Sequence, residues 1–160
     1  MNERIEISIR DQSLTLHRDE TLVQTYAVST AVNGPGEQEG SGSTPRGRHI
    51  VRAMIGRDCS IGAVFVGRRP TGEIYTEALA KAFPQRDWIL SRILWLSGLD
   101  IGKNRLGNVD TQRRYIYIHG CPDTEPMGVP RSHGCVRMRN RDVCQLFEQI
   151  NPGTPVTINE

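Results

Sequence analysis

A strict alternation of apolar and polar residues near the amino terminus is the feature that most constrains the fold. Ile5, Ile7 and Ile9 alternate with charged or hydroxyl residues, and Leu14 and Leu16 resume the pattern after a turn at residues 11–12. Side chains two positions apart share one face of a strand, whereas a helix would spread them around its circumference. The first half of the chain is therefore predicted to be antiparallel β structure.

The segment that follows, residues 33–47, is rich in glycine and proline and is predicted to be a long loop. Loops beyond about 12 residues without secondary structure are often functional, so this one is expected to border a substrate site. Strands are predicted at residues 48–55 and 63–67.

The second half contains helical signals. Residues 76–83 are rich in alanine and leucine and stop before Pro84, and Asp87 is placed to cap a helix over residues 88–97. Residues 114–119 are predicted to be a strand with His119 at its end. A last helix over 141–150, capped by Asn140, and a closing strand at 156–158 complete one mainly β domain over residues 1–160.

Composition excludes several classes of protein. The 20 Lys and Arg residues nearly balance the 18 Asp and Glu residues, and the formal net charge of +2 is too small for a nucleic-acid partner. No apolar run reaches the ~18 residues of a membrane span. The first ten residues lack the apolar core of a signal peptide, which predicts a cytoplasmic protein with reduced thiols.

The tripeptide His-Gly-Cys occurs twice, at residues 119–121 and 133–135. A thiol nucleophile needs a base, a neighbouring glycine for close approach of the substrate, and backbone N–H groups for the oxyanion, which His119, Gly134 and Cys135 can supply. Alternatively, the two histidines with Cys121 and Cys135 form a set of ligands that zinc accepts, although the His-x-Cys spacing is poor for a zinc knuckle. Spacing alone leaves both interpretations open.

The run Ser132-His133-Gly134-Cys135-Val136-Arg137-Met138, preceded by Ile118-His119-Gly120, resembles the signature of the L,D-transpeptidase (YkuD-type) catalytic domain. The opening strands, residues 42–47 and residues 153–156 resemble the same domain. The resemblance implies a mainly β, sandwich-like catalytic fold with short helices.

The resemblance also implies roles for individual residues. Cys135 matches the nucleophile, His119 its base, and Gly120 the residue whose backbone carbonyl orients the imidazole. His133, beside the nucleophile, is expected to shape the loop and position substrate. The substrate-binding residues implied by the match are these: Arg137, Ser132, Gly134 and Tyr117. Arg137 is expected either to pair with a substrate carboxylate or to bind backbone.

This family acts on the peptide stems of peptidoglycan and needs no cofactor or metal. The missing export signal and short chain favour an L,D-carboxypeptidase that removes the terminal D-alanine from tetrapeptide stems during cell-wall recycling. An L,D-transpeptidase and a non-catalytic zinc-binding module are the alternatives. Cys121, where many members carry threonine or serine, is interpreted as an inert small residue, a disulfide partner or a minor metal ligand.

Overall fold

A computed structural model describes residues 2–160 of the chain. Its elements are these: β1 (Glu3–Ser8), β2 (Ser13–Arg18), β3 (Thr21–Ala27), β4 (Gly47–Ile55), β5 (Ala63–Val66), β6 (Arg69–Ile74), α1 (Glu77–Ala82), β7 (Ile89–Gly98), the 3₁₀ helix η1 (Gly107–Val109), β8 (Tyr117–Cys121), β9 (Val136–Arg139), α2 (Asn140–Gln149) and β10 (Pro155–Asn159). The predicted mainly β fold is confirmed. No helix among the described residues is long and apolar enough to cross a membrane.

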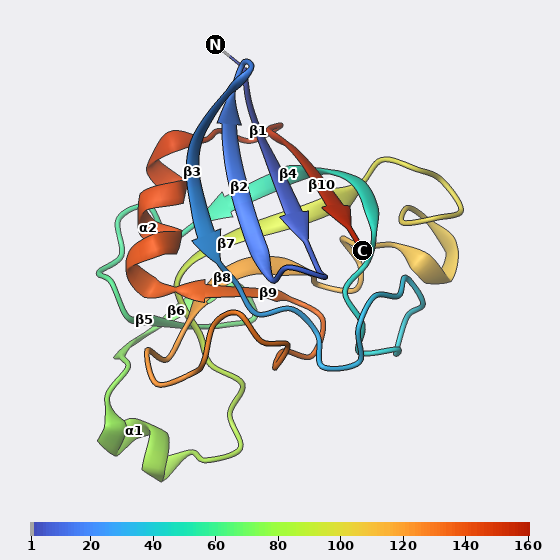
Figure 1. Cartoon of the computed structure of the whole chain (residues 1–160). Coiled ribbons are helices and arrows are strands. Elements are labelled where there is room, and N and C mark those ends of the chain that lie inside the picture. Colours follow the sequence, from blue (N-terminus) through green and yellow to red (C-terminus); the bar gives the residue numbers. More distant parts are fainter. Residues whose placement is uncertain (1) are drawn as a thin grey trace.

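All ten strands belong to one sheet, in the order β3-β2-β1-β10-β4-β7-β5-β6, with β8 and then β9 branching from β7. Two pairs are parallel, β1 with β10 and β8 with β9. In Figure 1 the strands β1, β2, β3 and β10 cross in front of β7, β8 and β9, with α2 along one side. The sheet therefore curls over itself, which gives it the layered form of a sandwich.

The main core lies between these two parts of the sheet. The alternating residues Ile5 and Ile7 of β1 and Leu14 and Leu16 of β2 are all buried and join one apolar cluster with residues of β7, β8, β9 and α2. The predicted inward face of the first strands is therefore correct. Burial of this cluster fixes β8, which contains the first His-Gly-Cys sequence, and β9, which directly follows the second, against the rest of the sheet.

The predicted helix over residues 88–97 is wrong, because this segment forms the ten-residue strand β7. It pairs with β8 on one side and with β4 and β5 on the other, so its backbone groups bond between strands. Ile93 packs on one face, whereas Leu94 lies in the main core on the other. A segment buried on both faces reads as a continuous apolar run, which periodicity cannot distinguish from a buried helix.

Smaller differences concern element boundaries. The helix predicted at residues 76–83 is α1, with Thr76 as its N-cap. In the last helix, Asn140 is the first helical residue and Arg139 the N-cap, one position earlier than predicted. The strand predicted at residues 114–119 begins only at Tyr117 and continues to Cys121, so His119 lies in the middle of β8 and not at its end. Strands β6 and β9 were not predicted.

Candidate active site

The parallel pairing of β8 with β9 places the predicted nucleophile and base on the same face of the sheet. His119 pairs with Arg137, and Cys135, which immediately precedes β9, continues this register beside Tyr117. Alternate residues of a strand share a face, so Tyr117, His119, Cys135 and Arg137 lie on the same side of the sheet. The intervening residues, Ile118 of β8 and its partner Val136 of β9, face the main core.

Cys135 is half-buried, and its sulfur is held by the backbone just before β8 and at its start. The Tyr117 N–H donates to Sγ over 3.3 Å, and Sγ–H donates to the Tyr115 carbonyl over 3.4 Å. Burial raises the pKa of the thiol to about 12, against the opposing effect of the Tyr117 N–H. The thiol is therefore neutral at pH 7 in the free protein, and its proton must leave as the attack begins.

His119 is only 1% exposed. Its Nδ1 lies 2.6 Å from the carbonyl oxygen of Gly120. Because a carbonyl can only accept, Nδ1 carries the proton and Nε2 keeps a free lone pair. Burial is the main cause that lowers the pKa of the imidazole, although the Gly120 carbonyl acts in the opposite direction. A neutral histidine with a free Nε2 is equipped to accept the thiol proton.

Gly120 is required at its position by steric contacts. A Cβ atom there would lie 2.6 Å from the carbonyl oxygen of Leu90 and would also collide with Oδ1 of Asn140. The Asn140 side chain donates to the Cys121 carbonyl over 2.8 Å and accepts from Ser91 Oγ over 2.6 Å. This network ties β8 to β7 and α2 behind the base.

Sequence reasoning missed the supporting role of Ser91 and Asn140. Ser91 interrupts an apolar run, and Asn140 precedes the last helical pattern, where it was interpreted as a cap. A polar residue inside a buried strand is the only available signal, because buried polar groups are normally hydrogen-bonded.

The loop that carries Cys135 is shaped by buried hydroxyl groups. Ser132 Oγ donates to the Cys135 carbonyl over 2.5 Å and accepts from the Gly134 N–H over 3.2 Å. Thr44 Oγ1 donates to the Gly134 carbonyl over 2.9 Å. Ser132 is therefore placed to shape the loop. Since the Gly134 N–H is engaged, the neighbouring Cys135 N–H is the candidate donor to an oxyanion formed at the sulfur.

A cleft of about 300 Å³ opens beside Cys135. Its lining consists of Gly67, Arg68, Asp87, Ile89, Arg114, Tyr115, Ile116, Tyr117, His133, Cys135 and Arg137. Two further hollows, of about 420 and 240 Å³, adjoin it, and the exposed His133 lines all three. A larger hollow of about 650 Å³, beside α1 and the start of α2, contains neither Cys135 nor His119.

The charged groups of the cleft are three arginines and the single carboxylate of Asp87. Arg137, which was predicted to bind substrate, has its Nη2 3.5 Å from Asp87 and its Nη1 3.9 Å from Glu125. Tyr117 accepts a hydrogen bond from Arg68 over 3.0 Å, and burial is the main cause that raises the pKa of its phenol. The surplus of positive charge suits an anionic ligand.

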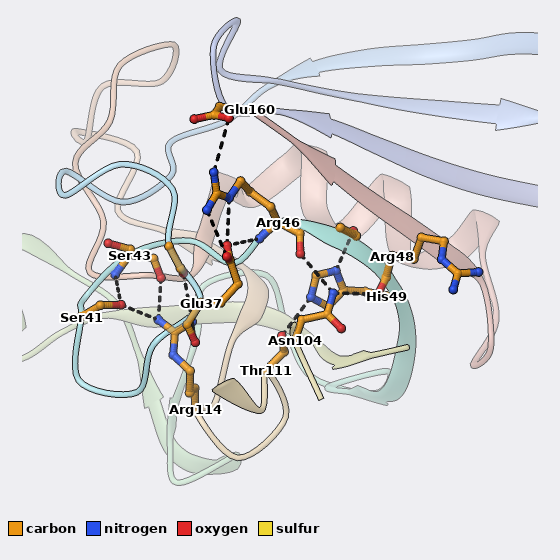
Figure 2. A network of polar contacts seen from close by, with 12 residues as sticks. Glu37, Ser41, Ser43, Arg46, Arg48, His49, Asn104, Thr111, Arg114 and Glu160 are labelled. Carbon is orange, nitrogen blue, oxygen red and sulfur yellow. Dashed lines mark hydrogen bonds and ion pairs between the residues drawn. The ribbon is translucent and has the colours of Figure 1, made fainter. Parts of the chain in front are cut away.

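The long loop at residues 33–47 borders the hollow of about 420 Å³ that adjoins the cleft, and Figure 2 shows the Arg114 side chain directed to Ser41 and Ser43 of this loop. Arg114 Nη2 donates to the Ser43 carbonyl over 2.6 Å, while its Nη1 lies 3.2 and 3.3 Å from the carbonyls of Gly36 and Glu37. The Glu37 carboxylate instead accepts two bonds from Arg46, over 2.9 and 3.0 Å, and these lower its pKa. The loop is thus fixed by two arginines, and Thr44 joins it to the loop that contains Cys135.

The ligands proposed for the alternative zinc site do not gather. Among residues 2–160, no group of three His, Cys, Asp or Glu side chains is placed to hold a metal ion. Cys121 lies opposite Arg139 of β9, and Arg139 is four residues beyond Cys135 in the chain. At about 3.3 Å per residue this separation is ~13 Å, too long for a disulfide. Cys121 is only 1% exposed, its sulfur lies 3.5 Å from the Met138 carbonyl oxygen, and burial raises its pKa to about 12.

Comparison with known proteins extends these observations. The family described as YkuD, the L,D-transpeptidase catalytic domain, matches residues 2–158. A putative L,D-transpeptidase YkuD of Bacillus licheniformis is 25% identical over 155 residues, which cover 97% of this chain and 64% of that protein. A probable L,D-transpeptidase YbiS of Escherichia coli (strain K12) is 46% identical over 43 residues, 27% of this chain and 14% of that protein.

Solved structures have the same fold. An L,D-transpeptidase from Mycobacterium smegmatis superposes with a TM-score of 0.59 at 15% identity, over 99% of this chain and 59% of that one. L,D-transpeptidase 3 from Mycobacterium tuberculosis, in complex with a faropenem-derived adduct, gives a TM-score of 0.59 at 16% identity, over 99% of this chain and 60% of that one. At such identities the likeness shows the fold alone, and the chain spans less than two thirds of each relative.

Proposed function

Because the chain belongs to the L,D-transpeptidase (YkuD) catalytic domain family, we propose that it transfers acyl groups of peptidoglycan stem peptides through a thioester on Cys135. The observation that carries this proposal is the common face of Cys135 and His119, with Nε2 of the histidine free to accept a proton. The cleft beside the sulfur supplies room for a peptide segment.

In the first half-reaction, Cys135 Sγ attacks the carbonyl carbon that links the diacid residue of a tetrapeptide stem to its terminal D-alanine. The thiol proton passes to His119 Nε2 as the S–C bond forms. The Cys135 N–H stabilises the oxyanion, a contribution of about 3 kcal/mol per donor in acyl-transfer enzymes. When the C–N bond breaks, the imidazolium returns the proton to the departing amine of D-alanine.

In the second half-reaction, water attacks the thioester carbonyl while His119 accepts one of its protons. Collapse of the intermediate releases the tripeptide carboxylate and restores the Cys135 thiol. The whole protein would then be an L,D-carboxypeptidase. Charge supports water over an amine as the acceptor: the cleft contains three arginines and one carboxylate, which disfavour a cationic ammonium group.

The second candidate activity is transpeptidation. It is favoured by the two hollows that adjoin the Cys135 cleft, each sharing residues with it, because they provide space for a second stem. In that case the amine of the acceptor stem replaces water in the second half-reaction.

Incubation with a tetrapeptide muropeptide, with and without a second stem as amine acceptor, tests both activities. We expect tripeptide and D-alanine in equal amounts, identified by mass, and little cross-linked product in either reaction. Dominant cross-linked product would replace the carboxypeptidase with the transpeptidase. Absence of any product, together with no acyl adduct on Cys135 by intact mass, would reject acyl transfer on these stems altogether.

A further inference from the structure

The three arginines of the Cys135 cleft differ in how their charge is used. Arg137 lies beside the carboxylates of Asp87 and Glu125. Arg114 directs its two terminal nitrogens to carbonyl and hydroxyl oxygens of the 33–47 loop, as seen in Figure 2. Arg68 has neither arrangement: within residues 2–160 it forms no ion pair, and its one hydrogen bond goes to the neutral phenol of Tyr117.

Arg68 is nevertheless held in a defined position. It lies at the turn between β5 and β6 with a φ of +65°, and its guanidinium carbon is 5.0 Å from the Trp95 ring centre and 4.8 Å from that of Tyr115. Aromatic faces attract a cation but carry no net charge that would neutralise it. The group is therefore immobilised over the cleft with its positive charge and further N–H donors available to a ligand.

The position of Arg68 relative to the nucleophile follows from shared contacts. Cys135 Sγ contacts the backbone of Tyr115 and Tyr117, and the side chains of the same two tyrosines hold Arg68. All four residues line the one cleft. A ligand whose carbonyl reaches Cys135 therefore passes close to the guanidinium.

We propose that Arg68 binds a carboxylate of the molecule that Cys135 attacks, and that it selects substrates by this group. The identity of that molecule as a stem peptide rests on the function proposed above. Two carboxylates of a stem peptide fit this chemistry. One is the terminal carboxylate of the leaving D-residue, and the other is the free carboxylate of the diacid residue whose carbonyl forms the thioester. A planar guanidinium can bind either in a bidentate manner.

The first test is independent of peptidoglycan chemistry. It compares alkylation of Cys135 by anionic iodoacetate and by neutral iodoacetamide at low ionic strength, followed by mass spectrometry of the peptide that contains Cys135. The neutral reagent reports the intrinsic reactivity of the thiol, so the ratio of the two rates reports the local attraction for an anion. Arg69, exposed and outside the cleft lining, is the matched control one residue away.

We expect Arg68→Gln to lower the iodoacetate-to-iodoacetamide rate ratio by about three- to tenfold, because it removes a positive charge from the lining of the cleft that contains the sulfur. Arg69→Gln should leave the ratio unchanged, and Arg68→Lys should retain most of it. Equal ratios in Arg68→Gln and Arg69→Gln would overturn the proposal. A variant with a disturbed cleft changes both rates, so the ratio remains a valid readout.

The second test identifies the carboxylate. Stem tetrapeptides with a free terminus, an amidated terminus or an amidated diacid residue are compared by kcat/KM in wild type and Arg68→Gln. We expect the variant to lose about 10- to 100-fold on the free acid, the range for a hydrogen bond to a charged group, but little on the peptide amidated at the recognised position. A uniform loss on all three peptides would contradict recognition by Arg68. If wild type cleaves none of them, the proposed function fails while the alkylation ratio still decides the role of Arg68.

Discussion

The two His-Gly-Cys tripeptides are identical in sequence and opposite in structure. Residues 119–121 lie inside β8, every residue of which is buried. Residues 133–135 lie in the loop before β9, where His133 is exposed and Cys135 half-buried at a cleft. Burial in the first lowers the pKa of His119 and leaves Cys121 1% exposed, whereas the cysteine of the second lines a cleft.

The central glycines of the two tripeptides are required for different physical reasons. Gly120 has ordinary strand geometry and is required because Leu90 and Asn140 leave no space for a side chain. Gly134 has a φ of +137° and is required by its backbone conformation. In the proposed function the buried tripeptide supplies the base, His119, and the tripeptide at the cleft supplies the nucleophile, Cys135. Four predictions test this division of roles.

The largest expected effect is the difference in turnover between alanine variants of the two cysteines. Cys135→Ala should reduce turnover of the stem peptide by at least about 10³-fold, because it removes the covalent route. Cys121→Ala, the matched control, should keep turnover within about threefold and lower the free energy of unfolding by about 1 kcal/mol. Circular dichroism of both variants should remain that of the wild type. Substantial turnover by Cys135→Ala would disprove its role as nucleophile.

Alanine variants of the two histidines should differ by a smaller factor in the rate of acylation. His119→Ala is expected to slow acylation by about 10²- to 10⁴-fold, since it removes the general base. His133→Ala should cost less than about tenfold, because this exposed side chain contributes only contacts along the cleft. Single-turnover kinetics that follow the acyl-enzyme by mass would measure both. A larger loss in His133→Ala would mean that the roles of the histidines are reversed.

Alanine substitution should separate the two glycines. Gly120→Ala is expected to lower the free energy of unfolding by about 1–3 kcal/mol, because its Cβ collides with buried backbone and side-chain oxygens. At Gly134 the nearest atom to a new Cβ is the movable end of Ile116, at 3.2 Å, but the φ of +137° strains any other residue, so Gly134→Ala should alter the loop that contains Cys135 and lower activity as well as stability. Urea denaturation would measure the first effect. A Gly120→Ala protein as stable as wild type would contradict the close packing described here.

The smallest effect concerns pH. His119 must be neutral to accept the thiol proton, and burial lowers its pKa below the ordinary value of 6.5. As pH falls, the imidazole therefore stays neutral to below pH 6.5, and kcat/KM should change by less than about threefold between pH 6.5 and 8. In His119→Ala, reactivity of Cys135 should instead rise about tenfold per pH unit, because burial raises its pKa to about 12. An acid limb centred above pH 6.5 would contradict a buried base.

Local patterns were sufficient where one residue's environment depends on its near neighbours in the chain. The alternation of Ile5, Ile7, Leu14 and Leu16 determined the inward faces of the first strands, and the glycine-rich run determined the loop at 33–47. The motif around Cys135 indicated the family, which the match over residues 2–158 bears out. These features need only the geometry of the chain itself.

The tertiary structure decided everything that depends on partners distant in sequence. The apolar run at 88–97 became a strand because β4, β5 and β8 surround it, and Asp87, interpreted as a helix cap, instead lies beside Arg137. The same holds for Arg68, which no motif marked and which the rings of Trp95 and Tyr115 hold in the lining of the Cys135 cleft. Sequence determines what each side chain can do chemically, whereas burial, charge and pKa arise from neighbours that only the folded sheet brings together.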